Sequence, residues 1–171
     1  MYIARAYKIC YFAYFKLNLY LYKLKFKEKS ILWLLDRVTV PVIIGASFVR
    51  LGNFFNSEIV GRYSHSNFGV VFLNRGENLP RHPAQLYEAF GYLILFFILR
   101  KVYNTKKRNQ EGYLIGLFFS GMFIIRFFIE FIKESQGGLE EFLPLFSTGQ
   151  WLSIPFILLG GYFMFKKRKI A

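Results

Sequence analysis

The stretch YLIGLFFSGMFIIRFFIEFI, which runs from Tyr113 to Ile132, decides the fold. Arg126 and Glu130 are the only charged residues within it. A helix needs about 20 predominantly apolar residues to cross the hydrocarbon core of a bilayer. A charge inside that core costs roughly 3 kcal/mol or more, so Arg126 and Glu130 indicate either a function or a mutual ion pair. The stretch therefore predicts a membrane-spanning helix.

Three more apolar stretches accompany it, at residues 31–55, 82–99 and 150–165. The last of them is short for a span, and the other two are long enough. Pro41 and Pro155 lie within these stretches, where neighbouring helices can compensate for the lost backbone hydrogen bond. We expect an all-α fold, a polytopic transmembrane helical bundle with about four spanning helices.

The first residues differ from the rest of the chain. Residues 2–22 are rich in Tyr and Phe but are broken by Arg5, Lys8 and Lys16, which suits a weak amphipathic or interfacial segment. We therefore divide the chain into an atypical basic and aromatic N-terminal segment, residues 1–30, and one transmembrane domain, residues 31–171. The single cysteine, Cys10, excludes an internal disulfide and a CxxC metal site.

The composition agrees with a membrane protein. Of the 171 residues, 54% are hydrophobic and 21% are aromatic, which is more apolar than a soluble domain of this size. The net charge is +13. A nucleic-acid-binding protein would gather that charge on one folded surface, whereas here it lies in clusters between apolar stretches. We therefore expect no nucleic-acid partner.

Three basic clusters predict the orientation of the bundle. Cytoplasmic loops retain Lys and Arg, so we expect all three clusters and the C-terminus on the cytoplasmic side of the membrane. The loops at residues 57–81 and 134–147 then lie outside. The clusters are Lys23, Lys25, Lys27 and Lys29; Arg100, Lys101, Lys106, Lys107 and Arg108; and Lys166, Lys167, Arg168 and Lys169.

In this topology, polar residues from four apolar stretches gather at the outer end of the bundle. Several of them recur at intervals of three or four residues, which places them on one helix face. Their convergence predicts a site at the outer leaflet. They are Arg50, Asn53, Asn56 and Glu58; Arg81, His82, Gln85 and Glu88; Arg126 and Glu130; and Thr148 and Gln150.

Structural roles remain open for several of these residues. Arg126 and Glu130 have the i, i+4 spacing of an intrahelical ion pair, which would also aim Arg126. Asn53 and Asn56 suit hydrogen bonds between helices. His82 suits a helix cap or a packing position at the start of its stretch.

Two arginines of this group, Arg50 and Arg126, predict an anionic ligand. A guanidinium group binds phosphate oxygens with two parallel hydrogen bonds. At the outer leaflet the most abundant phosphate belongs to a phospholipid. We expect a protein that binds anionic lipid head groups. A transporter would favour polar residues at mid-membrane on discontinuous helices, whereas these lie at one end.

Four segments of the chain resemble the signature of the prolipoprotein diacylglyceryl transferase family, in the order found in that family. The resemblance covers roughly residues 33–167. The segments are RLGNFFNSE at residues 50–58, closed by Gly61; RHPAQLYE at residues 81–88; RFFIEF at residues 126–131; and GQWLSIP at residues 149–155.

The resemblance implies a bacterial inner-membrane enzyme that moves the diacylglyceryl group of phosphatidylglycerol onto the lipobox cysteine of a prolipoprotein signal peptide. The product is a thioether, the leaving group is glycerol phosphate, and no metal or cofactor is implied. Arg50 and Arg126 would hold the lipid phosphate, Glu130 would orient Arg126, and Asn53 would bond the head group. We place the catalytic residues at Arg50, Arg126 and Glu130. We place the substrate-binding residues at Arg50, Asn53, Asn56, Glu58, Gly61, His82, Gln85, Glu88 and Arg126.

The resemblance is to the C-terminal part of the family. Members carry earlier spans and a histidine followed by glycines, and no such motif precedes Arg50 here. A thiol has a pKa of about 8.5, so a base must help to form the thiolate at neutral pH. We therefore expect this chain as written not to replace a lost transferase. A non-catalytic protein that binds anionic phospholipid and a transporter fragment are the alternatives.

Overall fold

The computed structural model describes residues 29–64, 69–134 and 145–166, together with Tyr20, Tyr22 and Lys25. Within these ranges the chain forms helices and isolated β-bridges but no strand, which confirms the predicted all-α class. Most of the expected N-terminal segment, with Cys10, lies outside the described residues. The elements are α2 (Ile31–Phe55), the 3₁₀ helix η1 (Leu73–Arg75), α3 (Ala84–Tyr103), the 3₁₀ helix η2 (Lys106–Asn109), α4 (Tyr113–Ile129) and α5 (Thr148–Phe165).

Local signals in the sequence begin two of the long helices. The Ser30 hydroxyl caps α2 by accepting from the Trp33 amide at 3.1 Å. Ser147 caps α5 in a capping box, in which its hydroxyl accepts from the Gln150 amide and the Gln150 side chain accepts from the Ser147 amide. Each helix continues through its internal proline. The predicted helices are confirmed, with boundaries that differ by a few residues at α3 and α5.

The start of α4 is capped by a residue from α2. Asp36 is 1% exposed, and its two carboxylate oxygens accept from the Gly112 amide at 2.7 Å and the Ile115 amide at 2.8 Å. Gly112 has φ 90°, a left-handed conformation that glycine adopts without a steric penalty. A carboxylate at a helix N-terminus also interacts favourably with the helix dipole. Asp36 therefore fixes the first turn of α4 against α2.

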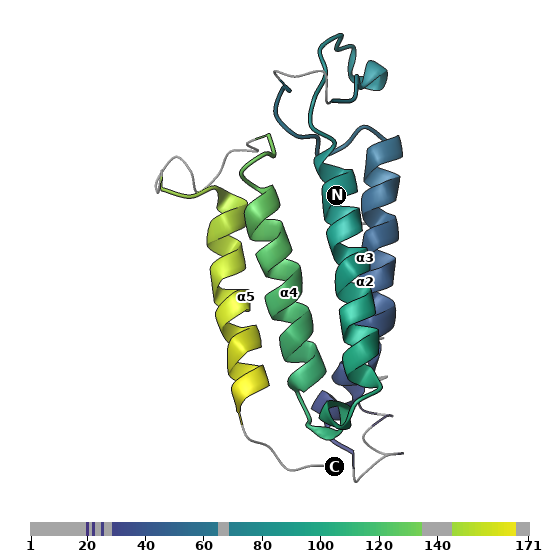
Figure 1. Ribbon diagram of the computed structural model, residues 1–171, viewed down its shortest axis with the longest axis vertical. Helices are drawn as coiled ribbons and strands as arrows, with labels where there is room; N and C mark the ends of the chain where they lie inside the picture. The colour runs from purple at the N-terminus through teal and green to yellow at the C-terminus, as the bar shows by residue number, and fades with distance from the viewer. Residues whose placement is uncertain are drawn as a thin grey trace.

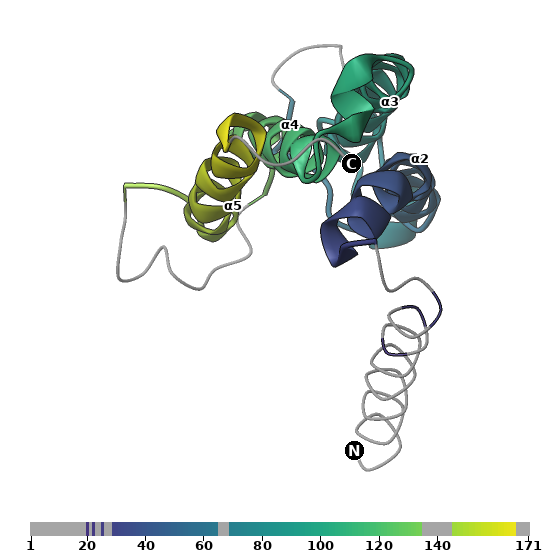
Figure 2. The same cartoon turned by 90° about the horizontal axis from the view of Figure 1, so that it is seen from below.

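The four long helices form one bundle (Figures 1 and 2). Helices α2 and α3 pack against each other, α4 packs against both, and α5 packs against α4. The helices alternate in direction, so α2 and α4 run one way and α3 and α5 the other (Figure 1). The core lies between α2, α3 and α4, and its buried residues are Ile43, Tyr92, Leu95, Leu99, Leu114, Ile115 and Phe118.

Helix α5 approaches α4 closely through small residues. A Cβ atom added to Gly116 would lie 2.7 Å from the Gly160 carbonyl oxygen, and one added to Gly160 would lie 2.6 Å from the Gly116 carbonyl oxygen. One turn further along, the rings of Phe123 and Phe156 stack with centroids 4.4 Å apart. Small residues are the usual means by which helices pack within a membrane, where lipid competes for apolar contacts.

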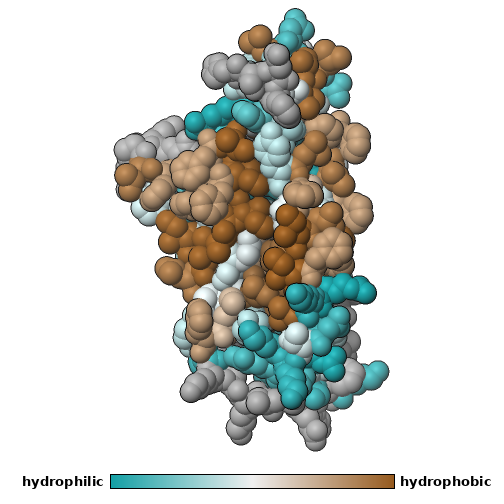
Figure 3. Space-filling view, viewed as in Figure 1, coloured by the Kyte–Doolittle hydropathy of each residue, from teal (hydrophilic) through white to brown (hydrophobic). Residues whose placement is uncertain are grey.

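The outer surface of the bundle is apolar. On the face seen in Figure 3, hydrophobic residues cover the middle of the molecule and hydrophilic residues lie towards both ends. Two helices, Ile31–Phe55 and Tyr113–Ile132, are long and apolar enough to cross a membrane, and only 22% and 17% of their most apolar windows are buried inside the protein. In the core of a soluble protein, most of such an apolar window would be buried. That the four long helices span a membrane stays a prediction.

Candidate functional site at the motif end

The four family-like segments meet at one end of the bundle, where α2 and α4 end and where α3 and α5 begin. We call this the motif end, and we call the opposite end the basic end. The segment after α2 links the other elements: the Gly61 amide donates to the His82 carbonyl at 2.9 Å, and the Arg62 amide donates to the Ile132 carbonyl at 2.9 Å. Gly61 allows this approach, because a Cβ atom there would lie 2.5 Å from the His82 carbonyl oxygen.

The loop at residues 69–83 lies beyond the helices at the motif end, and Arg81 holds it in place. Arg81 is 3% exposed. Its guanidinium donates to Glu77, pairs with Glu134 at 3.0 Å, donates to the Gly61 carbonyl at 3.2 Å and lies over the ring of Tyr63. The hydrogen bond from Arg81 lowers the pKa of Glu77, and the Glu77 carboxylate raises the pKa of Arg81. Arg81 therefore braces the loop, and its cationic group is already neutralised.

Beneath that loop lies a chain of buried charges contributed by three helical segments. Arg50 Nε at the end of α2 is 2.6 Å from Glu88 Oε2 on α3. The ammonium of Lys133, in the turn after α4, lies 4.0 Å from Glu88 Oε1 and 3.6 Å from Glu130 Oε2. The exposed fractions of these side chains are 13% for Arg50, 2% for Glu88, 5% for Lys133 and 11% for Glu130. We call these four residues the charge chain.

Arg126 lies beside this chain without a carboxylate of its own. The expected ion pair between Arg126 and Glu130 is absent from the described residues, where Glu130 pairs with Lys133 instead. Lys133 lies three residues after Glu130 and provides the ammonium that this carboxylate pairs with. The buried hydroxyl of Tyr92 lies in the electrostatic field of Glu88, Arg50 and Arg126, so the two arginines approach one region from α2 and α4.

The other expected site residues differ in how far their side chains are buried. Gln85 is 1% exposed, and its amide group donates to the Glu58 carbonyl at 2.6 Å, which joins the start of α3 to the end of α2. The side chains of Asn56 and Glu58 are exposed, and Asn53 is half-buried. In the described part of the chain neither asparagine side chain bonds another helix, so the expected interhelical role is not seen.

His82 takes part in the site through its backbone and its ring. Its backbone amide donates to the Arg62 carbonyl at 3.0 Å, and its backbone carbonyl accepts from the Gly61 amide. The ring nitrogen Nδ1 lies 3.4 Å from the Tyr87 hydroxyl. Pro83, and not His82, occupies the cap position of α3. The packing role left open for His82 therefore describes its position better than the capping role does.

Helix α5 closes the motif end against Glu130. A Cβ atom at Gly149 would lie 2.6 Å from Glu130 Oε2, so the glycine leaves room for the carboxylate in this position. The Gln150 amide group donates to the Phe127 carbonyl at 3.4 Å. Between α4 and α5 lies an open, polar-lined cavity of about 300 Å³. Its lining residues are Arg62, Glu130, Phe131, Leu145, Phe146, Ser147 and Gln150.

Two members of this region were not selected as site residues from the sequence. Lys133 continues the face of Arg126 and Glu130 at i+7 and i+3, so its helical spacing was a usable signal. Tyr92 follows Glu88 by four residues and is fully buried at the same level. Within the described ranges, no three His, Cys, Asp or Glu side chains gather to hold a metal ion.

Comparison with known proteins agrees with this arrangement. The sequence profile of prolipoprotein diacylglyceryl transferase matches residues 12–166. A phosphatidylglycerol–prolipoprotein diacylglyceryl transferase of Tolumonas auensis is 45% identical over 144 residues, which are 84% of this chain and 55% of the relative. Proteins of the same name are 42% identical over 158 residues in Bacteroides fragilis (90% of this chain, 56% of the relative) and 41% identical over 132 residues in Chlamydia trachomatis (77% and 48%).

The chain spans about half the length of the curated relatives that it matches. Those relatives are bacterial, and the apolar helices of this chain give it the character of a membrane protein. The matched region contains all four segments that form the motif end, together with the charge chain that connects them. This chain therefore belongs to the prolipoprotein diacylglyceryl transferase family.

Proposed function

We propose that the motif end serves the transfer of a diacylglyceryl group from phosphatidylglycerol to the lipobox cysteine of a prolipoprotein. The observation that supports this most is the balance of charge there. Three cations, Arg50, Arg126 and Lys133, lie together with two carboxylates, Glu88 and Glu130. One positive charge is left over, and Arg126 is the cation without an acidic partner in the described residues. An anionic head group would complete the balance.

The reaction needs this kind of site. A cysteine thiolate attacks the carbon of the diacylglyceryl group that is bonded to the phosphate oxygen. A carbon–sulfur bond forms, and the bond between that carbon and the phosphate oxygen breaks. The electron pair goes to the departing oxygen, so glycerol phosphate leaves with increased negative charge. Fixed cations aimed at that oxygen stabilise the transition state more than the ground state.

We assign roles from these positions. Arg126 binds the phosphate directly, and Arg50 is held in place by Glu88 and approaches the same phosphate from α2. Glu130 Oε2 is buried, lies 3.6 Å from the Lys133 ammonium and makes no hydrogen bond within the described residues, so it is the candidate acceptor of the thiol proton. Around them, the proposed contacts to the head group and its glycerol come from Asn53, Asn56, Glu58, Gly61, His82, Gln85 and Glu88.

We propose that the bundle lies in the bacterial inner membrane with the motif end at the outer leaflet. The basic end and the C-terminus then lie in the cytoplasm. Phosphatidylglycerol would approach through the bilayer, and the prolipoprotein signal peptide would present its cysteine at the polar cavity between α4 and α5. The names of the relatives, which contain both substrates, support this pairing.

Two measurements test this proposal, one for the binding of the lipid and one for the transfer of its diacylglyceryl group. The chain has two tryptophans, Trp33 near the basic end and Trp151 at the motif end. In a Trp33→Phe background, phosphatidylglycerol brominated on its acyl chains should quench Trp151 more strongly than brominated phosphatidylcholine does. Arg126→Ala should remove that preference. Arg126→Lys should restore it poorly, because a point charge does not reproduce the planar fork of a guanidinium.

Arg108→Ala is the matched control, since it removes one exposed arginine at the basic end and should leave the Trp151 preference unchanged. A lipobox peptide is then added, and mass spectrometry measures the thioether product and released glycerol phosphate. Preference for phosphatidylglycerol without any product would favour the non-catalytic lipid-binding alternative. Equal quenching by both lipids in the parent chain would contradict the proposed site.

A further inference from the structure

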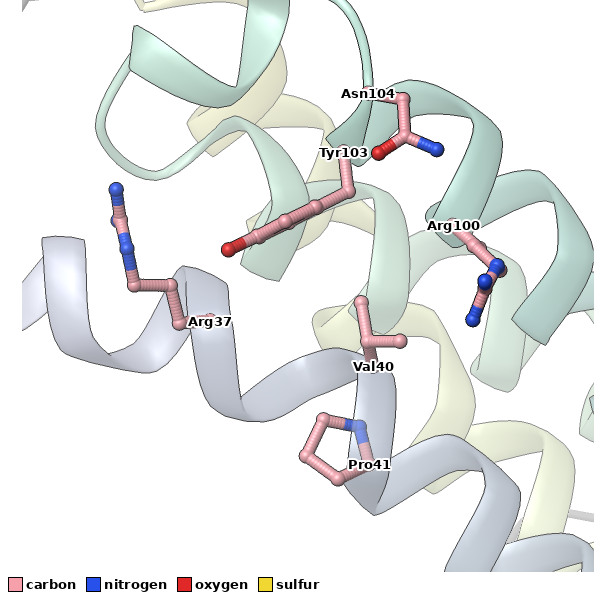
Figure 4. Close-up of a pocket in the computed structure, with 6 residues that line it drawn as sticks. All are labelled: Arg37, Val40, Pro41, Arg100, Tyr103 and Asn104. Carbon is pink, nitrogen blue, oxygen red and sulfur yellow. The ribbon is translucent and has the colours of Figure 1, made fainter.

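A cavity of about 380 Å³ lies between α2 and α3 near the basic end, away from the residues of the motif end. Figure 4 shows its lining: two arginines stand on either side, with the Tyr103 ring and the Val40 side chain between them. Arg37 comes from α2 and Arg100 from the last turn of α3. At 1.5 Å per residue, Arg37 and Arg50 are about 20 Å apart along α2. The cavity is therefore separate from the site at the motif end.

The first cation of the cavity is held in a fixed orientation. The guanidinium of Arg37 lies 3.4 Å from the centroid of the Trp33 ring, and its Nη1 donates to the Trp33 carbonyl at 2.9 Å. The carboxylate of the preceding residue, Asp36, accepts hydrogen bonds from the Gly112 and Ile115 amides. An arginine ordered in this way loses less conformational entropy when it binds an anion.

The second cation, Arg100, is exposed, and in the described part of the chain no carboxylate forms an ion pair with Arg37 or Arg100. The field around it is also positive. Lys101 follows it directly, and η2 adds Lys106 and Lys107 at the same end. The cavity therefore offers two guanidinium groups, and its lining in the described part of the chain includes no acid.

The cavity adjoins the apolar surface of the bundle. Val38 and Val42 on α2 and Phe97 on α3 lie within a turn or so of the lining residues, and each is exposed. A ligand with a negative head and an apolar tail would meet both surfaces at once. Basic pockets between membrane helices on the cytoplasmic side are a recurrent way to hold anionic lipid head groups.

We propose that this cavity binds the phosphate head group of an anionic phospholipid from the leaflet at the basic end. Arg37 and Arg100 bind the phosphate oxygens, Asn104 and the Tyr103 hydroxyl bond the polar head group, and the acyl chains lie over the exposed apolar residues of α2 and α3. This lipid is structural and is additional to any substrate at the motif end.

The experiment uses the fluorescence of Trp33, because the Arg37 guanidinium lies over the ring of this residue. In a Trp151→Phe background Trp33 is the only tryptophan, so its fluorescence reports the basic end alone. The full chain is placed in nanodiscs at 0.5 M salt, which screens diffuse surface attraction. We expect phosphatidylglycerol brominated on its acyl chains to quench Trp33 several-fold more efficiently, per mole of lipid, than brominated phosphatidylcholine.

Arg100→Gln should remove most of that preference, and Lys101→Gln is the matched control, because it removes the adjacent charge without altering the lining. Native mass spectrometry of Arg37→Gln gives a second reading and should show loss of one retained phosphatidylglycerol. Equal loss in Arg100→Gln and Lys101→Gln would overturn the proposal in favour of diffuse attraction. Displacement of the lipid by glycerol phosphate alone would show a site for free phosphate and would likewise overturn it. Because Trp33 and Trp151 are read separately, failure here is distinguishable from failure at the motif end.

Discussion

Glu88 neutralises cations from two other segments, because its carboxylate lies between Arg50 and Lys133 and is 2% exposed. Glu88→Gln would keep the shape of the side chain and leave the nearly buried Arg50 without a counter-charge. Breaking a buried ion pair from one side costs about 3–5 kcal/mol. We expect the free energy of unfolding in detergent to fall by roughly that amount. Thermal or denaturant unfolding of the purified chain measures it.

Glu58→Gln is the control for this substitution, because the Glu58 side chain is exposed and the hydrogen bonds of this residue in the described part of the chain are made by its backbone amide and carbonyl. Surface substitutions of this kind usually change stability by less than about 0.5 kcal/mol. An equal effect of the two substitutions would show that Glu88 does not hold the arginine in the folded chain.

Glu77 gives the outer loop a dependence on pH. The hydrogen bond from Arg81 lowers the pKa of its carboxyl group, with a further contribution from Arg75. A lowered pKa stabilises the folded loop at pH values above the unfolded value of about 4.3, and this contribution is lost as the pH falls through the lowered folded value. We expect amide protection in residues 69–83 to be constant from pH 7 to 5 and to decrease below about pH 4. Hydrogen exchange, expressed as protection factors, measures this.

Glu77→Gln should lower protection of the loop at pH 7 and should flatten its dependence on pH below 4. Amides within α3 provide the internal reference, since their protection depends on the bundle. If the variant kept the full acid response of the parent chain, a carboxylate outside the loop that pairs with its arginines, such as Glu134, would be responsible.

At the scale of whole elements, the contact between α4 and α5 depends on Gly160. Its added Cβ atom would lie 2.6 Å from both the Gly116 carbonyl oxygen and the Ser120 amide nitrogen, and backbone cannot move aside easily. Gly160→Leu should therefore separate α5 from α4 and cost several kcal/mol, within the range of large core overpacking. A cysteine pair placed across the two helices should lose its disulfide cross-linking efficiency, and unfolding should begin at a lower temperature.

Gly161→Leu is a close control for this prediction. It introduces the same side chain one residue later, where a Cβ atom would meet nothing within 4 Å. Its effect on cross-linking should be small. Equal disruption by both substitutions would mean that leucine disturbs the helix itself rather than the contact between helices.

The same elements explain how much of the fold the sequence predicted. Apolar length located α2 closely, because it is a local property of the sequence. The alternation of helices then placed Arg50 near Glu88 at one end, and the structure joins them. The partner of Glu130 stayed open in the sequence, since helical spacing permits both Arg126 and Lys133, and in the structure it is Lys133. The contact of Asp36 with Gly112 depends on how α2 and α4 pack, and no local pattern records it.

The site was predictable to a similar degree. The family-like segments indicated which residues converge, but they did not separate side chains that act in the interior from those that support the loop. Arg81 belongs to the same segment as Glu88, yet it braces the outer loop with Glu77 and Glu134. Such a difference arises from the crossing of residues 57–64 over the ends of α3 and α4, which only the tertiary structure contains.

At the scale of the whole molecule, the distribution of charge predicts the orientation in the membrane. At the motif end the loop arginines Arg75 and Arg81 are paired with Glu77 and Glu134. At the basic end the cations on η2 and on the last turn of α3 greatly outnumber the acids. Unpaired Lys and Arg in short loops remain on the cytoplasmic side. We therefore expect the connection between α3 and α4 inside and the loop before α3 outside.

Cysteine labelling tests this orientation in intact cells. In a Cys10→Ser background, Asn78→Cys in the loop before α3 should react with a membrane-impermeant maleimide, because that loop would face the outside. Asn109→Cys in η2 should react only after the membrane is made permeable. Reaction of Asn109→Cys in intact cells would place the basic end outside and would contradict the orientation. It would also move the motif end to the cytoplasmic leaflet, where a secreted precursor could not present its cysteine after crossing the membrane, so the proposed transfer and the orientation are tested together.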